Sequence, residues 1–274
     1  MPMHKDEIDG LVRKAQGGDK ASLQALVRAI QDDVYRLALR MLYDPDDASD
    51  ASQEILILVV TRLSTFEFRS AFRTWVYRVA ANYLMGAKKI RGKDPVLSFD
   101  DYRIDLESDL AESEDDAGGT EHQILLNEVR ISCTMAMLLC LDAKHRLAYI
   151  LGDIMELDHA EASRALSLSK ANFRKQLSRA RARVVEFTSR SCGLVSADAK
   201  CTCSKKLPGA VRRGRVDGRN IRYAAQSEAG YGEVRDRIQG LKGELRTLEL
   251  QTSVPLYNSP DDFGAMVEKL LEGA

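Results

Sequence analysis

Apolar side chains recur along the first ninety residues at the spacing of one buried helical face. From Leu23 to Met41 they follow an i, i+3, i+4, i+7 pattern, which predicts an amphipathic helix. The next stretch, from Ile55 to Val60, is apolar on all sides and indicates a second helix that is packed on several sides. This helix is predicted to begin at Pro45 with Asp44 as its cap, because aspartate caps helices and proline suits the first helical position. A third helix is predicted over residues 70–89.

The helical pattern then disappears and returns. Residues 93–121 contain proline, glycine and many acidic side chains, and we expect this flexible linker to bury nothing. Helical periodicity resumes near residue 122 and ends near residue 188. The sequence therefore predicts an all-α fold with two small helical domains, at 8–92 and 122–188. They are joined by the acidic linker at 93–121 and followed by a C-terminal extension at 189–274.

The second domain carries the layout of a helix-turn-helix motif. Asp158 with Glu161 and, eleven residues later, Ser169 are caps that predict two helices separated by a tight turn. The second helix has an apolar stripe and an otherwise basic circumference, which suits binding in a DNA major groove. Arg174 and Lys175, near its N-terminus, are the candidates for base edges, and the later arginines for phosphates. The alternative is an amphipathic surface helix whose charges are solvated.

An aromatic and basic stretch, STFEFRSAFRTWVYRVAANYL, precedes the linker. Aromatic rings and cations together can hold a melted single strand of DNA. Phe72 and Trp75 also have the spacing of a buried helical face and are predicted to belong to the core. Phe66 and Phe68, which we expect in a loop before the helix, are the candidates for contact with an extruded base.

Charge and composition exclude several classes of protein. The 40 Lys and Arg residues balance 41 Asp and Glu residues, but the signs are segregated: residues 65–93 hold seven basic side chains and one acidic one, and residues 100–116 hold nine acidic and one basic. The N-terminus does not have the layout of a signal peptide, and no apolar run is long enough to insert into a membrane. We therefore expect a cytoplasmic protein. Nucleotide-binding loops, nucleophile elbows and histidine-carboxylate clusters are lacking, so we do not predict an enzyme.

At the level of whole motifs, the chain resembles the extracytoplasmic-function (ECF) sigma factors of bacterial RNA polymerase. The segments DDASDASQEILILVVTRLSTF and FRTWVYRVAANYL are similar to region two of that family, and the helix-turn-helix that ends in LSRARARV is similar to region four. The resemblance covers residues 8–92 and 122–188. It implies promoter-specific transcription initiation, in a stress or envelope response, with core RNA polymerase and promoter DNA as partners.

The resemblance also implies which residues make contacts. The helix over 47–63 would dock on the beta-prime subunit of the polymerase, and the linker would pass through channels of the polymerase, whose beta subunit is a further expected partner. Candidate contacts to core polymerase are Asp47, Asp50, Gln53 and Glu54. Those to the melted upstream-of-start element are Phe66, Phe68, Arg69, Arg73, Arg78, Asn82 and Lys88. Those to the minus-thirty-five element are Ser169, Lys170, Asn172, Arg174, Lys175, Ser178, Arg179, Arg181 and Arg183.

The chain departs from the family pattern in two places. In NYLMGAKKIRGK, Gly86 weakens the helix that carries Asn82 and Lys88. The extension at 189–274 has no counterpart in a minimal member. An apolar stripe predicts a helix over 231–250, which we expect to fold back on the two domains and inhibit them as a separate anti-sigma factor would.

Cysteines cluster at the start of the extension. Cys192, Cys201 and Cys203 lie within twelve residues and could bind zinc together with His145, His159 or another cysteine, or form a regulatory disulfide. The spacing matches no zinc ribbon, so an incidental cluster is the alternative and no cofactor is predicted. Cys133 and Cys140, seven residues apart, are predicted to be core residues.

A second function class stays open. A helix-turn-helix regulator that senses a ligand or partner through its N-terminal domain would bind DNA without polymerase. A sigma factor would recognise a promoter only once polymerase is present.

Overall fold

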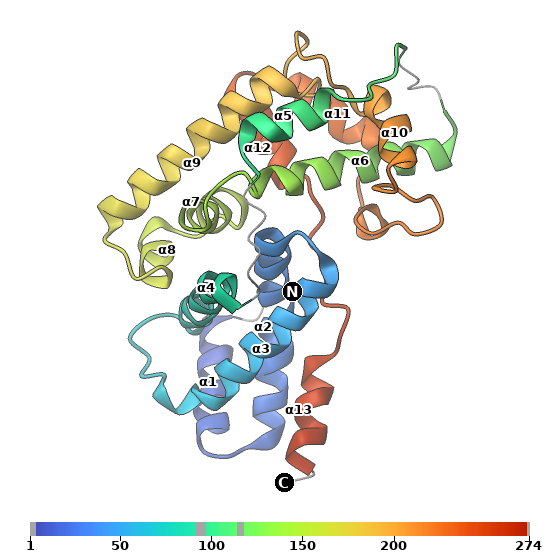
Figure 1. Cartoon of the computed structure of the whole chain (residues 1–274). Helices are drawn as coiled ribbons and strands as arrows, with labels where there is room; N and C mark the ends of the chain where they lie inside the picture. Colours follow the sequence, from blue (N-terminus) through green and yellow to red (C-terminus); the bar gives the residue numbers. More distant parts are fainter. Residues whose placement is uncertain (1–3, 91–96, 114–117, 273–274) are drawn as a thin grey trace.

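The computed structural model describes residues 4–90, 97–113 and 118–272, with side chains described except at 87–90 and 268–272 (Figure 1). Within these ranges the chain folds into helices and forms no β-strand; one isolated bridge joins Asp217 and Asn220. The all-α prediction is confirmed. No described helix is both long and apolar enough to cross a membrane.

The N-terminal helices are α1 (Lys5–Gln16), α2 (Lys20–Leu42), α3 (Pro45–Thr61) and α4 (Phe72–Ile90), with a 3₁₀ turn at Leu63–Thr65. The predicted cap of α3 is confirmed. Asp44 accepts hydrogen bonds from the backbone N–H groups of Asp46 and Asp47 at 3.0 and 3.1 Å, and Pro45 is the first helical residue.

The prediction that residues 93–121 bury nothing is wrong for their middle part. A helix, α5 (Phe99–Glu107), begins after Ser98, whose hydroxyl accepts a hydrogen bond from the N–H of Asp101. Tyr102 and Leu106 are buried, and the ring of Tyr102 stacks on Phe187 with 5.6 Å between centroids. Phe99, Tyr102 and Leu106 have helical spacing, so they share one face, which packs against the second domain, whereas Ile104 is exposed. Residues 93–96 and 114–117 lie outside the described residues.

The second domain contains α6 (Thr120–Leu138), α7 (Ala143–Tyr149), a π-helical turn (Ile150–Ile154), α8 (His159–Ala165) and α9 (Lys170–Ser191). The predicted caps both form: Asp158 accepts from the N–H of Ala160 at 2.7 Å, and Ser169 from that of Asn172 at 3.2 Å. A tight turn with Ser167 in the left-handed region (φ 55°) joins α8 to α9. Helices α8 and α9 are therefore arranged in the order of a helix-turn-helix motif.

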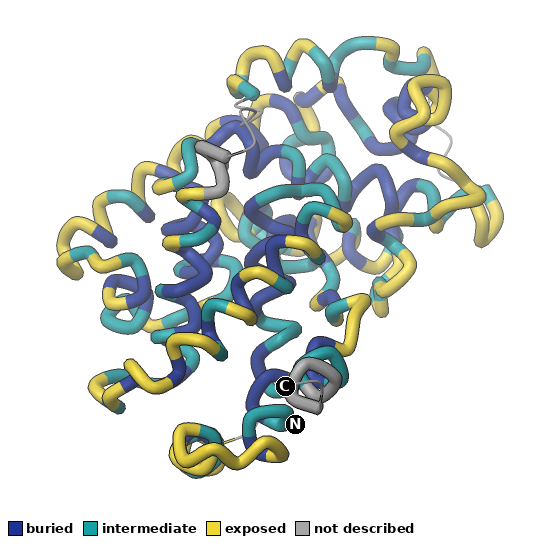
Figure 2. Tube along the Cα trace, turned by 60° about the horizontal axis from the view of Figure 1, so that its bottom comes forward, coloured by how far each residue is buried: buried dark blue, intermediate teal, exposed yellow. Residues whose placement is uncertain are grey.

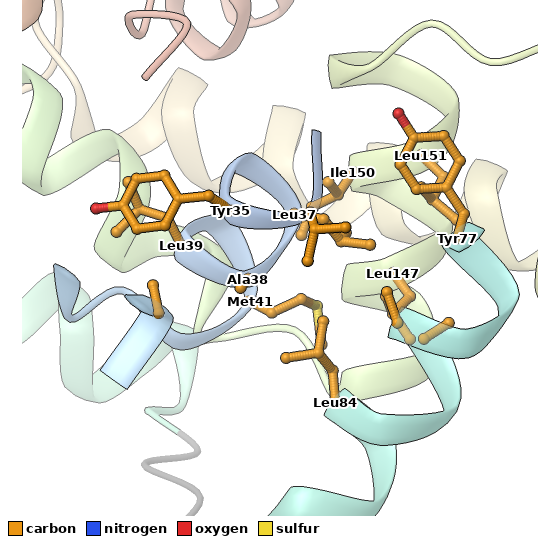
Figure 3. Packing of buried hydrophobic residues seen from close by; sticks show 14 of the residues in the cluster. Tyr35, Leu37, Ala38, Leu39, Met41, Tyr77, Leu84, Leu147, Ile150 and Leu151 are labelled. Carbon is orange, nitrogen blue, oxygen red and sulfur yellow. The ribbon is translucent and has the colours of Figure 1, made fainter. Parts of the chain in front are cut away.

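The two domains pack against each other and share one hydrophobic core. Figure 3 shows side chains of α2 gathered with Tyr77 and Leu84 of α4 and with Leu147 of α7. The buried Arg146 of α7 links the two domains by hydrogen bonds. Its guanidinium donates to the carbonyl of Met41 in α2 at 2.6 Å and to that of Leu141 in the second domain at 2.9 Å. In Figure 2 the buried residues run through the middle of the molecule and the exposed ones lie outside. The linker therefore joins domains that are in direct contact.

The C-terminal extension covers both domains. Its helices are α10 (Cys203–Arg212), a 3₁₀ turn (Ala224–Gln226), α11 (Tyr231–Gly240), α12 (Glu244–Thr252) and α13 (Phe263–Glu272). Helices α10 and α11 pack on α6, and α12 packs on α9 and α6, whereas α13 lies beside α2 (Figure 1). The prediction of one helix over 231–250 is wrong: the chain breaks between α11 and α12, where Gly243 adopts a positive φ of 55°.

Candidate nucleic-acid interface

Helix α9 presents a cationic face to solvent. Its apolar stripe, formed by Phe173, Leu177, Ala180, Val184 and Phe187, is buried against the rest of the second domain. This packing fixes which side of the helix faces outward. The candidate contacts on that side are all exposed: Ser169, Lys170, Asn172, Arg174, Lys175, Ser178, Arg179, Arg181 and Arg183. The sequence-predicted recognition residues are thus brought together on one surface.

Arg181 differs from its neighbours because it has a carboxylate partner. Its guanidinium donates two hydrogen bonds to Asp153 of the π-helical turn, at 2.8 and 2.6 Å, and the Asp153 side chain is only 7% exposed. These hydrogen bonds raise the pKa of Arg181. A phosphate would have to compete with Asp153 for this group, so Arg181 holds α9 against the π-helical turn.

Phe66 lies in a loop before α4, as predicted, but its side chain is not open for contact with an extruded base. Its side chain is buried, and its ring lies 4.8 Å from that of Phe68 and 5.3 Å from that of Phe72. The amide of Gln16 donates 2.9 Å hydrogen bonds to the carbonyls of Leu63 and Phe66 and so anchors the loop on α1. These contacts join residues about fifty positions apart, which a local pattern does not reveal.

Phe68 is half-buried and lies under a cation. The Arg13 guanidinium is 4.0 Å from its ring centroid, a cation–π arrangement, and Phe68 has a positive φ of 58°. A base could stack on this ring only from the side that Arg13 leaves open.

The cations around α4 mostly have partners within the protein. Arg69 pairs with Glu67 at 2.7 Å, Arg73 pairs with Asp33 of α2, and Arg78 donates to the carbonyl of Arg164 in α8 at 3.1 Å. Asn82 is exposed, and the side chain of Lys88 lies outside the described residues. The face of α4 that carries Arg73 and Arg78 is therefore turned toward other helices of this chain.

The candidate polymerase-binding helix α3 is partly covered by the extension. Asp50 and Glu54 are exposed and Asp47 is half-buried, but the amide of Gln53 lies 3.4 Å from the sulfur of Met266 in α13. Two further contacts along α3 had no signal in the sequence. The Ser49 hydroxyl donates to Asp261, and Arg222 pairs with Asp44 at 3.1 Å.

Two family models match the chain. The model described as Sigma-70 region 2 matches residues 26–88, and the one described as Sigma-70, region 4 matches residues 131–184. The first includes α3 and the aromatic segment, and the second includes the helix-turn-helix.

Similar proteins carry sigma-factor names. The RNA polymerase sigma-H factor of Pseudomonas aeruginosa is 34% identical over 33% of this chain, and the chain spans about half (47%) of that relative. The ECF RNA polymerase sigma factor SigW of Bacillus subtilis is 27% identical over 62% of this chain and 90% of that protein. The ECF sigma-E factor of Escherichia coli is 27% identical over 62% of this chain and 88% of its own length.

Among solved structures, the sigma factor RpoE in complex with the anti-sigma factor NepR from Bartonella quintana aligns with 60% of this chain and 94% of that one. The identity is 20% and the TM-score is 0.42.

The two sigma regions occur here in one chain and in family order, and relatives with ECF names match across both. The family predicted from the motifs is confirmed. The chain carries sigma-70 regions 2 and 4 at residues 26–88 and 131–184, and it is similar to the extracytoplasmic-function sigma factors of bacterial RNA polymerase.

Proposed function

We propose that this chain binds core RNA polymerase, through its beta-prime and beta subunits, and directs initiation at specific promoters in a stress or envelope response. The observation that carries this proposal is the exposed cationic face of α9, which follows a capped short helix inside the region-four match. In the proposed complex α9 reads the minus-thirty-five element, and residues 65–89 act at the upstream-of-start element. In this role the chain does not catalyse a reaction itself. It would act in the cytoplasm, where the polymerase is.

DNA binding with and without polymerase separates this proposal from a plain regulator. Fluorescently labelled promoter fragments would be titrated with the chain alone, with core polymerase alone and with both. We expect sequence-specific binding only in the mixture. Specific binding by the chain alone, unchanged by polymerase, would support the regulator instead.

Replacing Arg174 by alanine is expected to weaken recognition of the minus-thirty-five element. An arginine that reads a guanine edge contributes about 1–3 kcal/mol of discrimination, so binding should fall by roughly 5- to 150-fold and tolerate base changes at one position. Arg190→Ala is the matched control, because Arg190 is exposed on the same helix but pairs with Glu186 near the C-terminal end. Equal losses for both variants on every sequence would contradict base reading by Arg174.

We further propose that the extension acts as an internal inhibitor. Residues 253–272, which we call the strap, run from the end of α12 across α2 to the edge of α3. Arg40 of α2 is buried and donates to the carbonyls of Gln251 at 3.1 Å and Val254 at 3.5 Å. Burial lowers the pKa of Arg40 to about 10. This guanidinium supports the point where the strap leaves α12.

Further contacts support the strap along α2. Arg28 binds Asp262 through two hydrogen bonds of 3.1 and 3.2 Å, and the N–H of Phe263 donates to Gln31 at 3.1 Å. Phe263 itself is 2% exposed. The Arg28 side chain packs directly on the backbone of Gly264, since a Cβ there would lie 2.5 Å from its Cγ. While the strap is bound, it covers one edge of α3, the helix that polymerase is proposed to contact.

The acidic linker is also engaged by the extension. Asp105 pairs with Arg213 at 3.0 Å and with Arg215, and Asp109 pairs with Arg213. The guanidinium groups lower the pKa of Asp105. Because the family likeness implies that this linker enters polymerase channels, these pairs would have to break when polymerase binds.

A further inference from the structure

The cysteines of the extension do not assemble a metal site in the described part of the chain. Cys192, Cys201 and Cys203 line a small cavity together with Cys133 of α6, and all four are free thiols. No group of three or more histidine, cysteine or carboxylate side chains in the described ranges could hold a metal ion. Burial raises the pKa of these thiols, which makes them poor nucleophiles.

A different cavity lies where the N-terminal helices, the second domain and the strap meet. Its walls come from α2, α4, the residues at the end of the π-helical turn, and the strap with the end of α12. Its volume is about 360 Å³, within the range of small-molecule sites, about 300–1,000 Å³. A small organic molecule in this cavity would therefore contact all three parts of the chain.

The charged side chains of this lining are mostly cationic. Three guanidinium groups line the cavity, those of Arg36 and Arg40 in α2 and of Arg73 in α4, together with the carboxylates of Asp33 and Glu156. Asp33 is already paired with Arg73 and, at 3.5 Å, with Arg36. Glu156 is exposed, so solvent screens its charge. Three cations against two anions leave one positive charge in the lining.

The charge of Arg40 is the one without a counter-charge. Arg40 is 6% exposed, and in the described part of the chain its hydrogen bonds go to the carbonyls of Gln251 and Val254 and not to a carboxylate. Burying a charge without a counter-charge is costly. An anion in the cavity would reduce that cost.

Tyr77 of α4 provides an unused hydrogen-bond donor at the wall of the cavity. Tyr77 is 6% exposed, and its hydroxyl forms no hydrogen bond with any described residue. Figure 3 shows this hydroxyl at the far end of the ring, pointing away from Leu84 and Leu147. Burial raises the pKa of Tyr77 to about 12, so the hydroxyl keeps its proton at neutral pH. Because buried polar groups are normally hydrogen-bonded, the hydroxyl indicates a missing acceptor.

Two of the guanidinium groups also have N–H groups left for a ligand. Arg36 donates to the carbonyl of Tyr257 at 2.8 Å and to the side chain of Asn258 at 3.3 Å, and its guanidinium has further N–H groups. Nε of Arg73 has no hydrogen-bond partner among the described residues. Guanidinium groups bind the oxygens of carboxylates and phosphates through paired hydrogen bonds.

We propose that this cavity binds a small organic oxyanion, a carboxylate or a phosphate monoester, through Arg36, Arg73 and Tyr77. The buried charge of Arg40 adds to the attraction. The guanidinium groups and the hydroxyl all donate, which matches an oxyanion that only accepts.

Apolar side chains complete the lining and would contact the body of the ligand. Ile154 and Met155 come from the second domain and Pro255 from the strap. Because the lining also includes α2 and α4, a bound ligand holds the N-terminal helices, the second domain and the strap together. Ligand binding to the packed chain is therefore expected to raise its melting temperature.

Isothermal titration calorimetry of the full chain tests this inference. The probes are phenyl phosphate and benzoate, and benzyl alcohol is their neutral counterpart. We expect at least one of the two anions to bind at one site per chain, and benzyl alcohol not to bind. Binding of one anion and not of the other would assign the ligand to a phosphate or to a carboxylate.

Tyr77→Phe removes the hydroxyl and keeps the ring. We expect this variant to bind the anion more weakly by about tenfold or more, since the hydroxyl would donate to a charged group. Its melting temperature without ligand should not fall, because the hydroxyl has no partner there among the described residues. Tyr35→Phe is the matched control, because Tyr35 is buried on α2 but does not line the cavity.

Arg36→Ala should likewise weaken the binding of the anion by about tenfold or more. Arg28→Ala is its control. Arg28 also contacts the strap, through Asp262, but lies outside the cavity. The comparison therefore separates a contact with the ligand from a loosening of the strap.

Three results would overturn the proposal. The first is the lack of saturable binding of both anions to the unmodified chain, and the second is equally tight binding of benzyl alcohol. The third is a Tyr77→Phe or Arg36→Ala chain that binds the anion as tightly as the unmodified chain does. These measurements involve neither polymerase nor promoter DNA, so the anion site can fail while the sigma function stands.

Discussion

Replacing Phe263 by alanine is expected to raise the affinity of this chain for core RNA polymerase by about tenfold or more, since truncating a buried phenylalanine costs about 3–5 kcal/mol and would shift the population away from the strapped form. Phe263 is the buried anchor of α13 on α2, and it is not itself one of the predicted polymerase contacts. The affinity would be measured by titrating fluorescently labelled chain with purified core polymerase.

The control for this experiment is Leu256→Ala. Leu256 belongs to the same strap but is 75% exposed, so its removal should leave the affinity unchanged. Limited proteolysis would report whether residues 253–272 have been released. If the strap is released in Phe263→Ala while the affinity stays at the level of the unmodified chain, internal inhibition is wrong.

Replacing Phe66 by alanine is expected to lower the free energy of unfolding by about 3–5 kcal/mol, because the ring is buried among Phe68, Phe72 and Trp75 and its loss leaves a cavity. Urea denaturation followed by circular dichroism measures this change.

An exposed neighbour provides the comparison for Phe66. Arg69→Ala should change the stability by no more than about 0.5 kcal/mol, as is usual for surface positions. A Phe66→Ala chain of normal stability with weakened binding to melted promoter DNA would restore the role predicted from the sequence.

Sequence patterns were reliable where the responsible contacts are local. The caps at Asp44, Asp158 and Ser169 act within three residues, and the buried stripe of α9 repeats within one helix. Such features could be predicted because each depends on a few neighbouring side chains.

Features that depend on distant contacts could not be predicted. Phe66 is buried because Gln16 and α4 enclose its loop. Helix α5 is stabilised within the acidic linker because Tyr102 stacks on Phe187. The strap is the extreme case, since Arg28 and Asp262 are 234 positions apart. The expectation that the extension folds back rested on an unpartnered apolar stripe, but nothing in that stripe indicated α2 as the surface that receives α13.

Contacts within the chain occupy several of the surfaces that the proposed complex would use. Arg78 of α4 donates a hydrogen bond to the helix-turn-helix, and Gln53 of α3 contacts the strap. Asp105 of the linker pairs with Arg213 and Arg215, which follow α10. Three predicted contact surfaces are thus engaged within the chain, whereas the cationic face of α9 is exposed. Binding to polymerase would have to exchange these internal contacts for contacts with polymerase and DNA.

Promoter-directed transcription by purified core RNA polymerase tests the central claim most directly. Genomic fragments would be transcribed with polymerase alone, with the full chain added and with the Phe263→Ala chain added, and the transcript starts would be mapped. We predict defined start sites that require the chain and stronger initiation with Phe263→Ala. Unchanged transcription in all three reactions, together with specific promoter binding by the chain alone, would contradict its assignment as an initiation subunit.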